Sequence, residues 1–153
     1  MGELAADAPR DCPLCPRLVS FRAANRSSEP DWHNAPVPSF APSDAAQARL
    51  LIVGLAPGLK GANRTGRPCT GDYAGHLLYD TLLAHGFARG RYDARPDDSL
   101  ALVGCVITNA VRCVPPENKP TPTEIATCRH FLVQCLSSLP RLQAIVALGR
   151  IAH

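Results

Sequence analysis

Three short, continuous apolar runs stand out along the chain, at residues 49–55, 100–107 and 143–148. Each run lacks the alternation of a strand with one exposed face, and each is followed by small or polar residues. Continuous apolar runs of this length are typical of strands in a parallel sheet, because such strands are covered on both faces. We therefore predict three buried, parallel strands.

The segments before and between these runs have helical character. It is found in residues 12–26, 73–85 and 121–139, where apolar residues recur at helical spacing. Asp11 is predicted to cap the first helix, and the third begins with a proline and an acidic residue in its first turn. Strands that alternate with helices predict an α/β protein, with a three-layer α/β/α fold around a small parallel sheet.

The size and the ending of the chain suggest how complete this fold is. The 153 residues suit one domain with a core of its own. Residues 149–153 resemble the opening turn of a further helix, and a parallel sheet of three strands is small. We therefore expect residues 1–153 to form a single domain that is incomplete at its C-terminal end and lacks its last strand.

Charge and composition restrict the partners only weakly. The formal net charge is +3, and fourteen of the 16 basic residues are arginine, which suits contacts with phosphate. No apolar run reaches the length of a membrane span, and residues 1–11 lack the features of a signal peptide. We expect a cytoplasmic monomer without membrane contact. In that reducing compartment the seven cysteines are more suited to metal binding than to disulfides.

Four of the cysteines have the spacing of metal ligands. Cys12 and Cys15 form a C-x2-C pair next to prolines, and Cys113 and Cys128 follow far along the chain. Four thiolates could hold a [4Fe–4S] cluster or a zinc ion, and the sequence alone does not choose between them. The pair could also be a redox dithiol, and Cys128 lies on the apolar stripe of its helix, where it could be a core residue. Two further cysteines on apolar faces are expected in the core: Cys105 and Cys135.

A glycine-rich loop at residues 54–72 lies beyond the carboxyl end of the first predicted strand, where parallel sheets bind ligands. The loop matches neither the P-loop nor the dinucleotide-binding motif, so nucleotide-phosphate enzymes are disfavoured. Its glycines would let backbone N–H groups approach a ligand, and Lys60, Arg64 and Arg67 could meet phosphates. Asp72 stands at a helix entrance, where it is either an N-cap or a catalytic carboxylate.

The order of four segments resembles the uracil-DNA glycosylase superfamily, in particular its iron–sulfur members, and is most similar to family 5, the type b enzymes. The resemblance extends over nearly the whole chain. Its long loop is specific, whereas a C-x2-C pair alone would not be. The segments are CPLCPRL at 12–18, DWHNAPVP at 31–38, GLAPGLKGANRTGRPCTGD at 54–72, and TNAVRCVPPENKP at 108–120 followed by Cys128.

The resemblance implies a DNA repair enzyme that acts at the bacterial nucleoid. Such an enzyme hydrolyses the bond between deoxyribose and uracil, or another deaminated base such as hypoxanthine, and leaves an abasic site in DNA. The base must leave the stack first, and its departure leaves positive charge on the sugar. Asp72 and Asn109 would position the attacking water, because Ala56 stands where related families carry a water-activating side chain.

The resemblance also implies a base pocket and a cofactor. The implied substrate-binding residues are Gly54, Leu55, Ala56, Pro57, Gly58, Asn63 and Cys69. Backbone N–H groups of this loop would bind the leaving base as an anion. A structural [4Fe–4S] cluster, with zinc as the alternative, would be held by Cys12, Cys15, Cys113 and Cys128. His33, in the second segment, would lie near the base pocket.

Two departures from the family pattern affect the expected activity. Cys69 stands where the family usually has an aromatic residue that stacks on the base. Loss of a stacking ring weakens binding by about 1–3 kcal/mol, which predicts a relaxed or altered base preference. The family's His-Pro-Ser-type motif is absent, and His153 is not assigned to it, so we expect a fragment that is poorly folded and inactive. The alternatives are a non-catalytic iron–sulfur or zinc module that binds DNA or protein, and an inactive truncated paralogue.

Overall fold

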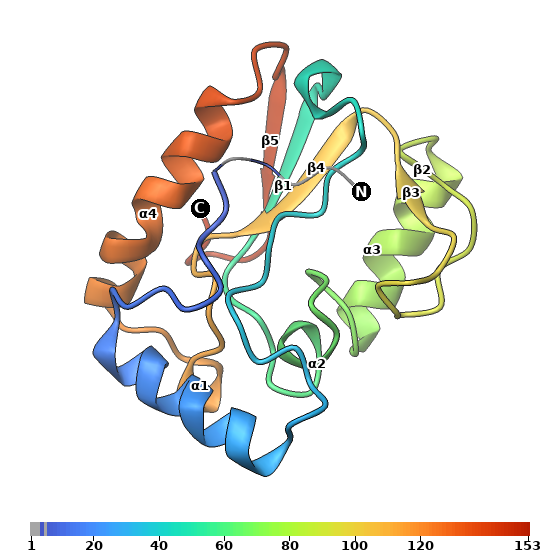
Figure 1. Cartoon of the computed structure of the whole chain (residues 1–153). Helices are drawn as coiled ribbons and strands as arrows, with labels where there is room; N and C mark the ends of the chain where they lie inside the picture. The colour runs from blue at the N-terminus through green and yellow to red at the C-terminus, as the bar shows by residue number, and fades with distance from the viewer. Residues whose placement is uncertain (1–3, 5) are drawn as a thin grey trace.

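The central sheet is parallel and has three strands in the computed structural model, which describes residue 4 and residues 6–153. The strand order is β4-β1-β5, with β1 (Leu50–Gly54) between β4 (Cys105–Asn109) and β5 (Ala144–Ala147) (Figure 1). β1 and β4 pair along their whole length, so that Gly54 lies opposite Asn109. The prediction of a small parallel sheet built from the three apolar runs is confirmed.

Helices cover both faces of this sheet. α4 (Pro122–Ser137) packs on one face and α3 (Tyr73–Ala84) on the other (Figure 1). Successive residues of a strand point to opposite faces, so Leu51 belongs to the apolar cluster beneath α4 and Ile52 to the cluster beneath α3. The first cluster includes Leu51, Val53, Val106, Cys135 and Leu139, and the second includes Ile52, Ile107, Tyr79, Leu82 and Cys105. The predicted three-layer α/β/α architecture is confirmed.

The first helix, α1 (Pro16–Ser28), begins later than the sequence predicts. Its N-cap is Cys15, which makes no side-chain capping bond, and a proline occupies the first turn, where a missing N–H costs nothing. The prediction that Asp11 caps this helix is wrong. The carboxylate of Asp11 instead accepts a hydrogen bond from the guanidinium of Arg26, at 2.7 Å.

The start of α4 agrees with the sequence. The Thr121 hydroxyl accepts a hydrogen bond from the backbone N–H of Glu124, and the Glu124 carboxylate accepts one from the N–H of Thr121. This reciprocal capping box satisfies two N–H groups that the first turn would otherwise leave unpaired. Within the described part of the chain, no helix combines the length and the apolar composition needed to cross a bilayer.

The apolar run at residues 100–107 does not form the single strand that the sequence predicts. Gly104 adopts a left-handed conformation, with φ of +67°, and divides the run into β3 (Ala101–Leu102) and β4. β3 pairs antiparallel with β2 (Ala88–Arg89), apart from the main sheet. Short helical turns lie elsewhere in the connections: η1 (Ala45–Gln47), α2 (Ala62–Thr65) and η2 (Pro116–Asn118).

β5 is more exposed than the sequence predicts. Ile145 and Val146 keep 54% and 45% of their surface accessible, so the expectation of a third buried strand is wrong. The reason is the position of β5 in the sheet. It pairs with β1 on one side, and no strand among the described residues pairs with its other side.

Candidate active site and cysteine pocket

A pocket lies at the carboxyl ends of β1 and β4, beside the first turn of α3. Eight of the predicted site residues line it: Gly54, Leu55, Ala56, Pro57, Gly58, Cys69, Asp72 and Asn109. Its remaining walls are Ala62, Thr70, Ala74, Gly75, Leu78 and Leu148. This is the edge at which parallel α/β sheets bind ligands. The fold therefore brings together segments that lie far apart in the sequence.

The floor of this pocket is the last pair of the β1–β4 ladder. A Cβ atom on Gly54 would stand only 2.5 Å from Oδ1 of Asn109, so only glycine leaves room for the amide. The backbone N–H of Ala110 also donates to the Gly54 carbonyl, at 2.9 Å. The Asn109 amide therefore lies directly over the end of β1, with 4% of the residue exposed.

Arg112 contacts the backbone of Asn109 from inside the protein. The sequence alone does not identify Arg112 as a site residue. Its side chain is completely buried, and its Nε donates to the Asn109 carbonyl at 3.0 Å. Its Nη1 pairs with the carboxylate of Asp7, and its backbone N–H donates to the Sγ of Cys128 at 3.4 Å. One residue therefore contacts both the pocket strand and the predicted metal ligands. The sequence signal was a lone arginine in an otherwise apolar and small segment.

Asp72 is the N-cap of α3. Its Oδ1 accepts a hydrogen bond from the backbone N–H of Gly75, at 2.7 Å. Gly75 has no room for a side chain, because a Cβ atom there would meet the Cys69 carbonyl at 2.1 Å. The helix therefore starts in close contact with the loop. The cap uses one hydrogen-bond acceptor position of the Asp72 carboxylate. A carboxylate has two oxygens and several acceptor positions, so others remain for a ligand or water.

Cys69 is held on the pocket wall by a constrained backbone. Its φ of +58° lies in the left-handed region that non-glycine residues rarely adopt. The carbonyl of the preceding Pro68 accepts a hydrogen bond from the hydroxyl of Tyr79, at 2.6 Å. Burial, together with the nearby negative charge of Asp72, raises the pKa of the Cys69 thiol to about 11. The side chain is therefore a neutral thiol at neutral pH.

The glycines of the loop let its two arms, one around Gly61 and the other around Thr70 and Gly71, cross in direct contact. A Cβ atom on Gly61 would stand 2.3 Å from the carbonyl oxygen of Thr70. A Cβ atom on Gly71, whose φ is +88°, would stand 2.7 Å from the Cα of Gly61. The sequence predicts that these glycines let the backbone approach a ligand. In the structure, Gly61 and Gly71 let the backbone approach itself.

Two predicted residues lie away from the pocket. The amide of Asn63 is buried and donates to Oδ1 of Asn34 at 3.0 Å, so it joins the loop to the 31–38 segment. The ring of His33 lies beside Gly66, and its Nε2 is 3.1 Å from the Pro36 carbonyl. Burial lowers the pKa of His33. Neither residue lines the pocket that contains Asp72 and Asn109.

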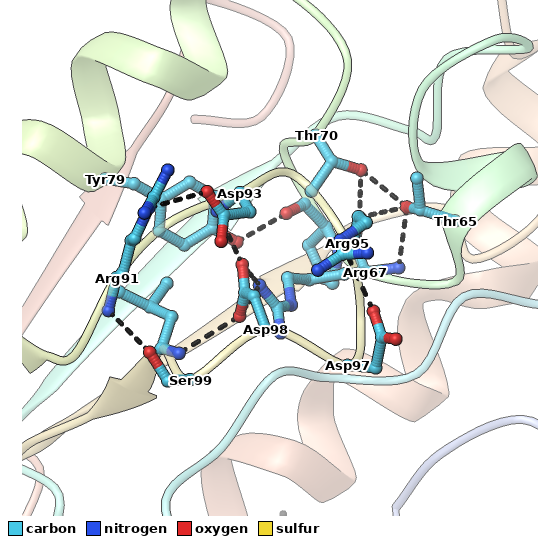
Figure 2. Close-up of polar contacts among 12 residues, drawn as sticks. Thr65, Arg67, Thr70, Tyr79, Arg91, Asp93, Arg95, Asp97, Asp98 and Ser99 are labelled. Carbon is cyan, nitrogen blue, oxygen red and sulfur yellow. Dashed lines mark hydrogen bonds and ion pairs between the residues drawn. The ribbon is translucent and has the colours of Figure 1, made fainter.

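Arg67 is part of a buried ion pair, so the expectation that it meets phosphate is wrong. Its guanidinium lies 2.9 Å from the Asp98 carboxylate (Figure 2). It also lies 4.5 Å from the centre of the Phe40 ring. Burial alone would raise the pKa of Asp98. Hydrogen bonds from the N–H of Asp93, from Arg67 and from the N–H of Leu100 nevertheless lower that pKa. The pair ties the glycine-rich loop to the 91–99 segment.

The four predicted metal ligands line a second pocket together. Cys12 and Cys15 precede α1, Cys113 follows β4, and Cys128 lies on α4. Burial raises the pKa of the Cys15, Cys113 and Cys128 thiols, and that of Cys113 reaches about 12. Two N–H groups approach the sulfurs: the backbone N–H of Arg112 at Cys128, and a guanidinium N–H of Arg22 at Cys113, 3.6 Å away.

This donor set fits a metal–thiolate centre. Its ligands would be thiolates, and the N–H groups and the guanidinium around them would stabilise negative charge on sulfur. In the described part of the chain, no three His, Cys, Asp or Glu side chains stand close enough to share one metal ion. The expectation for the two other cysteines is confirmed, because Cys105 and Cys135 are fully buried in the apolar clusters of the sheet.

The fold and the pocket define an α/β protein with a pocket at the carboxyl edge of a short parallel sheet. Residues 41–153 match the family model of the uracil DNA glycosylase superfamily, and the chain belongs to that superfamily. It is 46% identical over 147 residues to a type-5 uracil-DNA glycosylase of Thermus thermophilus, with 92% of this chain covered. It is 38% identical over 146 residues to a type-5 enzyme of Pyrobaculum aerophilum, with 93% covered.

The type-4 relatives match a smaller part of the chain. A type-4 uracil-DNA glycosylase of Archaeoglobus fulgidus is 36% identical over 107 residues, which is 69% of this chain and 46% of that protein. The longer and closer matches to type-5 proteins support the assignment to family 5. The chain spans 65% and 63% of the length of the Thermus and Pyrobaculum relatives.

Proposed function

We propose that residues 1–153 act as a glycosylase domain that removes uracil from DNA and leaves an abasic site. The observation that carries the proposal is the pocket itself. It joins Asp72 and Asn109 to the backbone of the Gly54–Gly58 turn at the carboxyl edge of the sheet. The names of the type-5 relatives support uracil as the base. Other deaminated bases are further candidates, because Cys69 leaves more room than a ring would.

The reaction is a hydrolysis. The bond between C1′ of deoxyribose and the ring nitrogen of uracil breaks, and its electron pair leaves with the base. The oxygen of a water molecule bonds to C1′, and a proton of that water returns to the base or to solvent. Positive charge on the sugar would be stabilised by the Asp72 carboxylate. Asn109, whose amide offers both a donor and an acceptor, would orient the water.

The turn after β1 would bind the departing base. Within the described part of the chain, the backbone N–H groups of Ala56 and Gly58 donate to no other protein group. Ala56 carries no polar side chain, so it can neither activate water nor compete for the base. Backbone N–H groups that are fixed before the reaction stabilise a developing anion without reorganisation. They are therefore suited to the anionic form of uracil.

We further propose that a [4Fe–4S] cluster is held by Cys12, Cys15, Cys113 and Cys128. In such a cluster each thiolate binds a different iron. The assignment is supported by the pocket that the four cysteines line together and by the Arg22 and Arg112 N–H groups that donate to two of the sulfurs. When bound, the cluster would supply a covalent link between α1 and the rest of the fold. Iron and sulfide analysis of the purified protein, with zinc measured in parallel, tests this assignment.

The catalytic proposal is tested with a duplex that carries one uracil, followed by alkaline cleavage at the abasic site. Asp72→Asn keeps the ability to cap α3 but loses the charge, so we expect single-turnover excision to fall by at least about a hundredfold, or roughly 3 kcal/mol. Asn109→Ala should reduce it similarly. Asp80→Asn is the matched control, because Asp80 is exposed on the same helix and does not line the pocket.

Two results would count against a catalytic role. Equal excision by the Asp72→Asn and Asp80→Asn proteins would exclude Asp72 as the essential carboxylate. DNA binding without excision, in a protein that carries iron and is folded, would instead support a non-catalytic iron–sulfur module.

A further inference from the structure

Arg22 places a positive charge inside the cysteine pocket. The residue lies in the second turn of α1, and only 4% of its surface is exposed. Its Nη1 donates to the Sγ of Cys113 at 3.6 Å, and its Nη2 donates to the carbonyl of Cys12 at 2.9 Å. A single guanidinium therefore contacts two of the predicted ligand residues, which lie far apart in the sequence.

This buried charge has no carboxylate partner among the described residues. Asp11 is the acidic residue close enough for Arg22 to affect its pKa, but its side chain is exposed and is already paired with Arg26 at 2.7 Å. A buried charge without a counter-charge is strongly unfavourable. Neutral thiols do not supply that counter-charge. A metal–thiolate centre does, because four thiolates outweigh the positive charge of the metal core.

We propose that Arg22 is the counter-charge of the iron–sulfur cluster and a hydrogen-bond donor to it through Cys113. This inference rests on the proposed cluster. A cation at this position stabilises the reduced form of a cluster more than the oxidised form, because reduction adds negative charge. Arg22 therefore raises the reduction potential of the cluster. It also slows loss of the cluster, since its charge and its hydrogen bond to the Sγ of Cys113 oppose departure of that ligand.

Two variants at position 22 separate charge from size. Arg22→Lys keeps the positive charge, and Arg22→Gln keeps a polar side chain but removes the charge. Arg26→Gln is the matched control, because Arg26 lies one turn further along α1 and binds Asp11 outside the pocket. The measurements on the complete, cluster-loaded chain are iron and sulfide per chain, the midpoint potential of the cluster, and the half-life of its visible absorbance in excess chelator.

We expect Arg22→Gln to lower the midpoint potential and to shorten the half-life in chelator several-fold. Arg22→Lys should lie close to the unmodified protein, and Arg26→Gln should be indistinguishable from it. If Arg22→Gln yields no soluble iron protein while Arg22→Lys does, the requirement for charge is supported directly.

Equal potentials and equal half-lives for Arg22→Gln and Arg22→Lys would overturn the role of Arg22 and leave the cluster itself in place. An unmodified protein that contains zinc, or no metal, would overturn the cluster and the inference together. Iron and sulfide analysis of the unmodified protein therefore tells the two failures apart.

Discussion

The Asp72 carboxylate has one structural role, and the proposed reaction gives it a second. It caps α3 through Gly75, and it is the proposed stabiliser of charge on the sugar. Removal of the side chain would therefore combine a structural loss of about 1 kcal/mol with a chemical one. Asparagine is also a good N-cap, so Asp72→Asn retains the cap and isolates the chemistry. This is why the proposed test uses asparagine and not alanine.

Cys69 offers a test of the pocket environment that does not depend on catalysis. Thiolates react with iodoacetamide and thiols do not, and burial raises the pKa of Cys69 to about 11. Below that pKa the side chain is neutral. Alkylation of Cys69, followed site by site by peptide mass spectrometry, should be slow at about pH 8 and should still be increasing near pH 10. In the urea-unfolded chain the same site should label with an ordinary pKa near 8.5.

If Cys69 in the folded protein labels at the unfolded rate at about pH 8, its thiol is not buried as described. The pocket wall would then be open to solvent, and the expected relaxed or altered base preference would lose its structural basis.

At the level of elements, the glycine-rich loop is held by contact between its own arms. Gly61→Ala would place a methyl group 2.3 Å from the Thr70 carbonyl oxygen. The backbone can relieve this steric clash only if the two arms of the loop move apart. We expect a loss of unfolding free energy of about 1–3 kcal/mol, measured by urea denaturation. Gly58→Ala is the matched control in the same loop, because its nearest contact would be at 4.0 Å.

A Gly61→Ala protein as stable as Gly58→Ala would show that the arms do not touch. Gly58→Ala itself should change stability little, since alanine also restricts the unfolded chain.

The ion pair between Arg67 and Asp98 anchors the same loop to the 91–99 segment, as Figure 2 shows. Asp98→Asn would leave the buried guanidinium without its counter-charge, at a cost of about 3 kcal/mol. The pKa of Asp98 is lowered in the folded protein. Its contribution is therefore complete above the unfolded pKa of about 3.9 and is lost as pH falls through the lower, folded value.

Unfolding free energies of the unmodified and Asp98→Asn proteins should thus differ at about pH 7 and converge under acid conditions, below about pH 4. A difference that is constant with pH would mean that the charge of Asp98 is not the source of its contribution. Asp97→Asn is the control, because the Asp97 side chain is mostly exposed.

For the molecule as a whole, the sequence predicted the features that depend on local pattern. The three strands, the layers and the start of α4 all follow from apolar patterning and the residues at the helix start. The pocket was also located, because the carboxyl ends of parallel strands meet at one edge. The split at Gly104 was missed, since an apolar run does not reveal a glycine turn within it. The exposure of β5 depends on its neighbours and not on its own residues.

Long-range polar contacts could not be predicted in this way. Asp11 has the sequence position of a helix cap but pairs with Arg26. Arg67 has the sequence position of a phosphate ligand, but Asp98, thirty-one residues later, neutralises it. Arg112 and Asp7 are separated by 105 residues. Each of these pairings depends on which segments the fold brings together. The apolar periodicity of a segment does not indicate which other segment will lie beside it.

The contact between Gly54 and Asn109 has an evolutionary consequence. A side chain at position 54 collides with the amide at position 109, so no single substitution of the glycine leaves the asparagine in place. The reverse order is open, because a smaller residue at position 109 first creates the space that position 54 needs. A lineage that loses the asparagine can therefore go on to lose the glycine, and return is then blocked until the glycine is restored. Descendants that carry both substitutions should therefore have acquired the change at position 109 first.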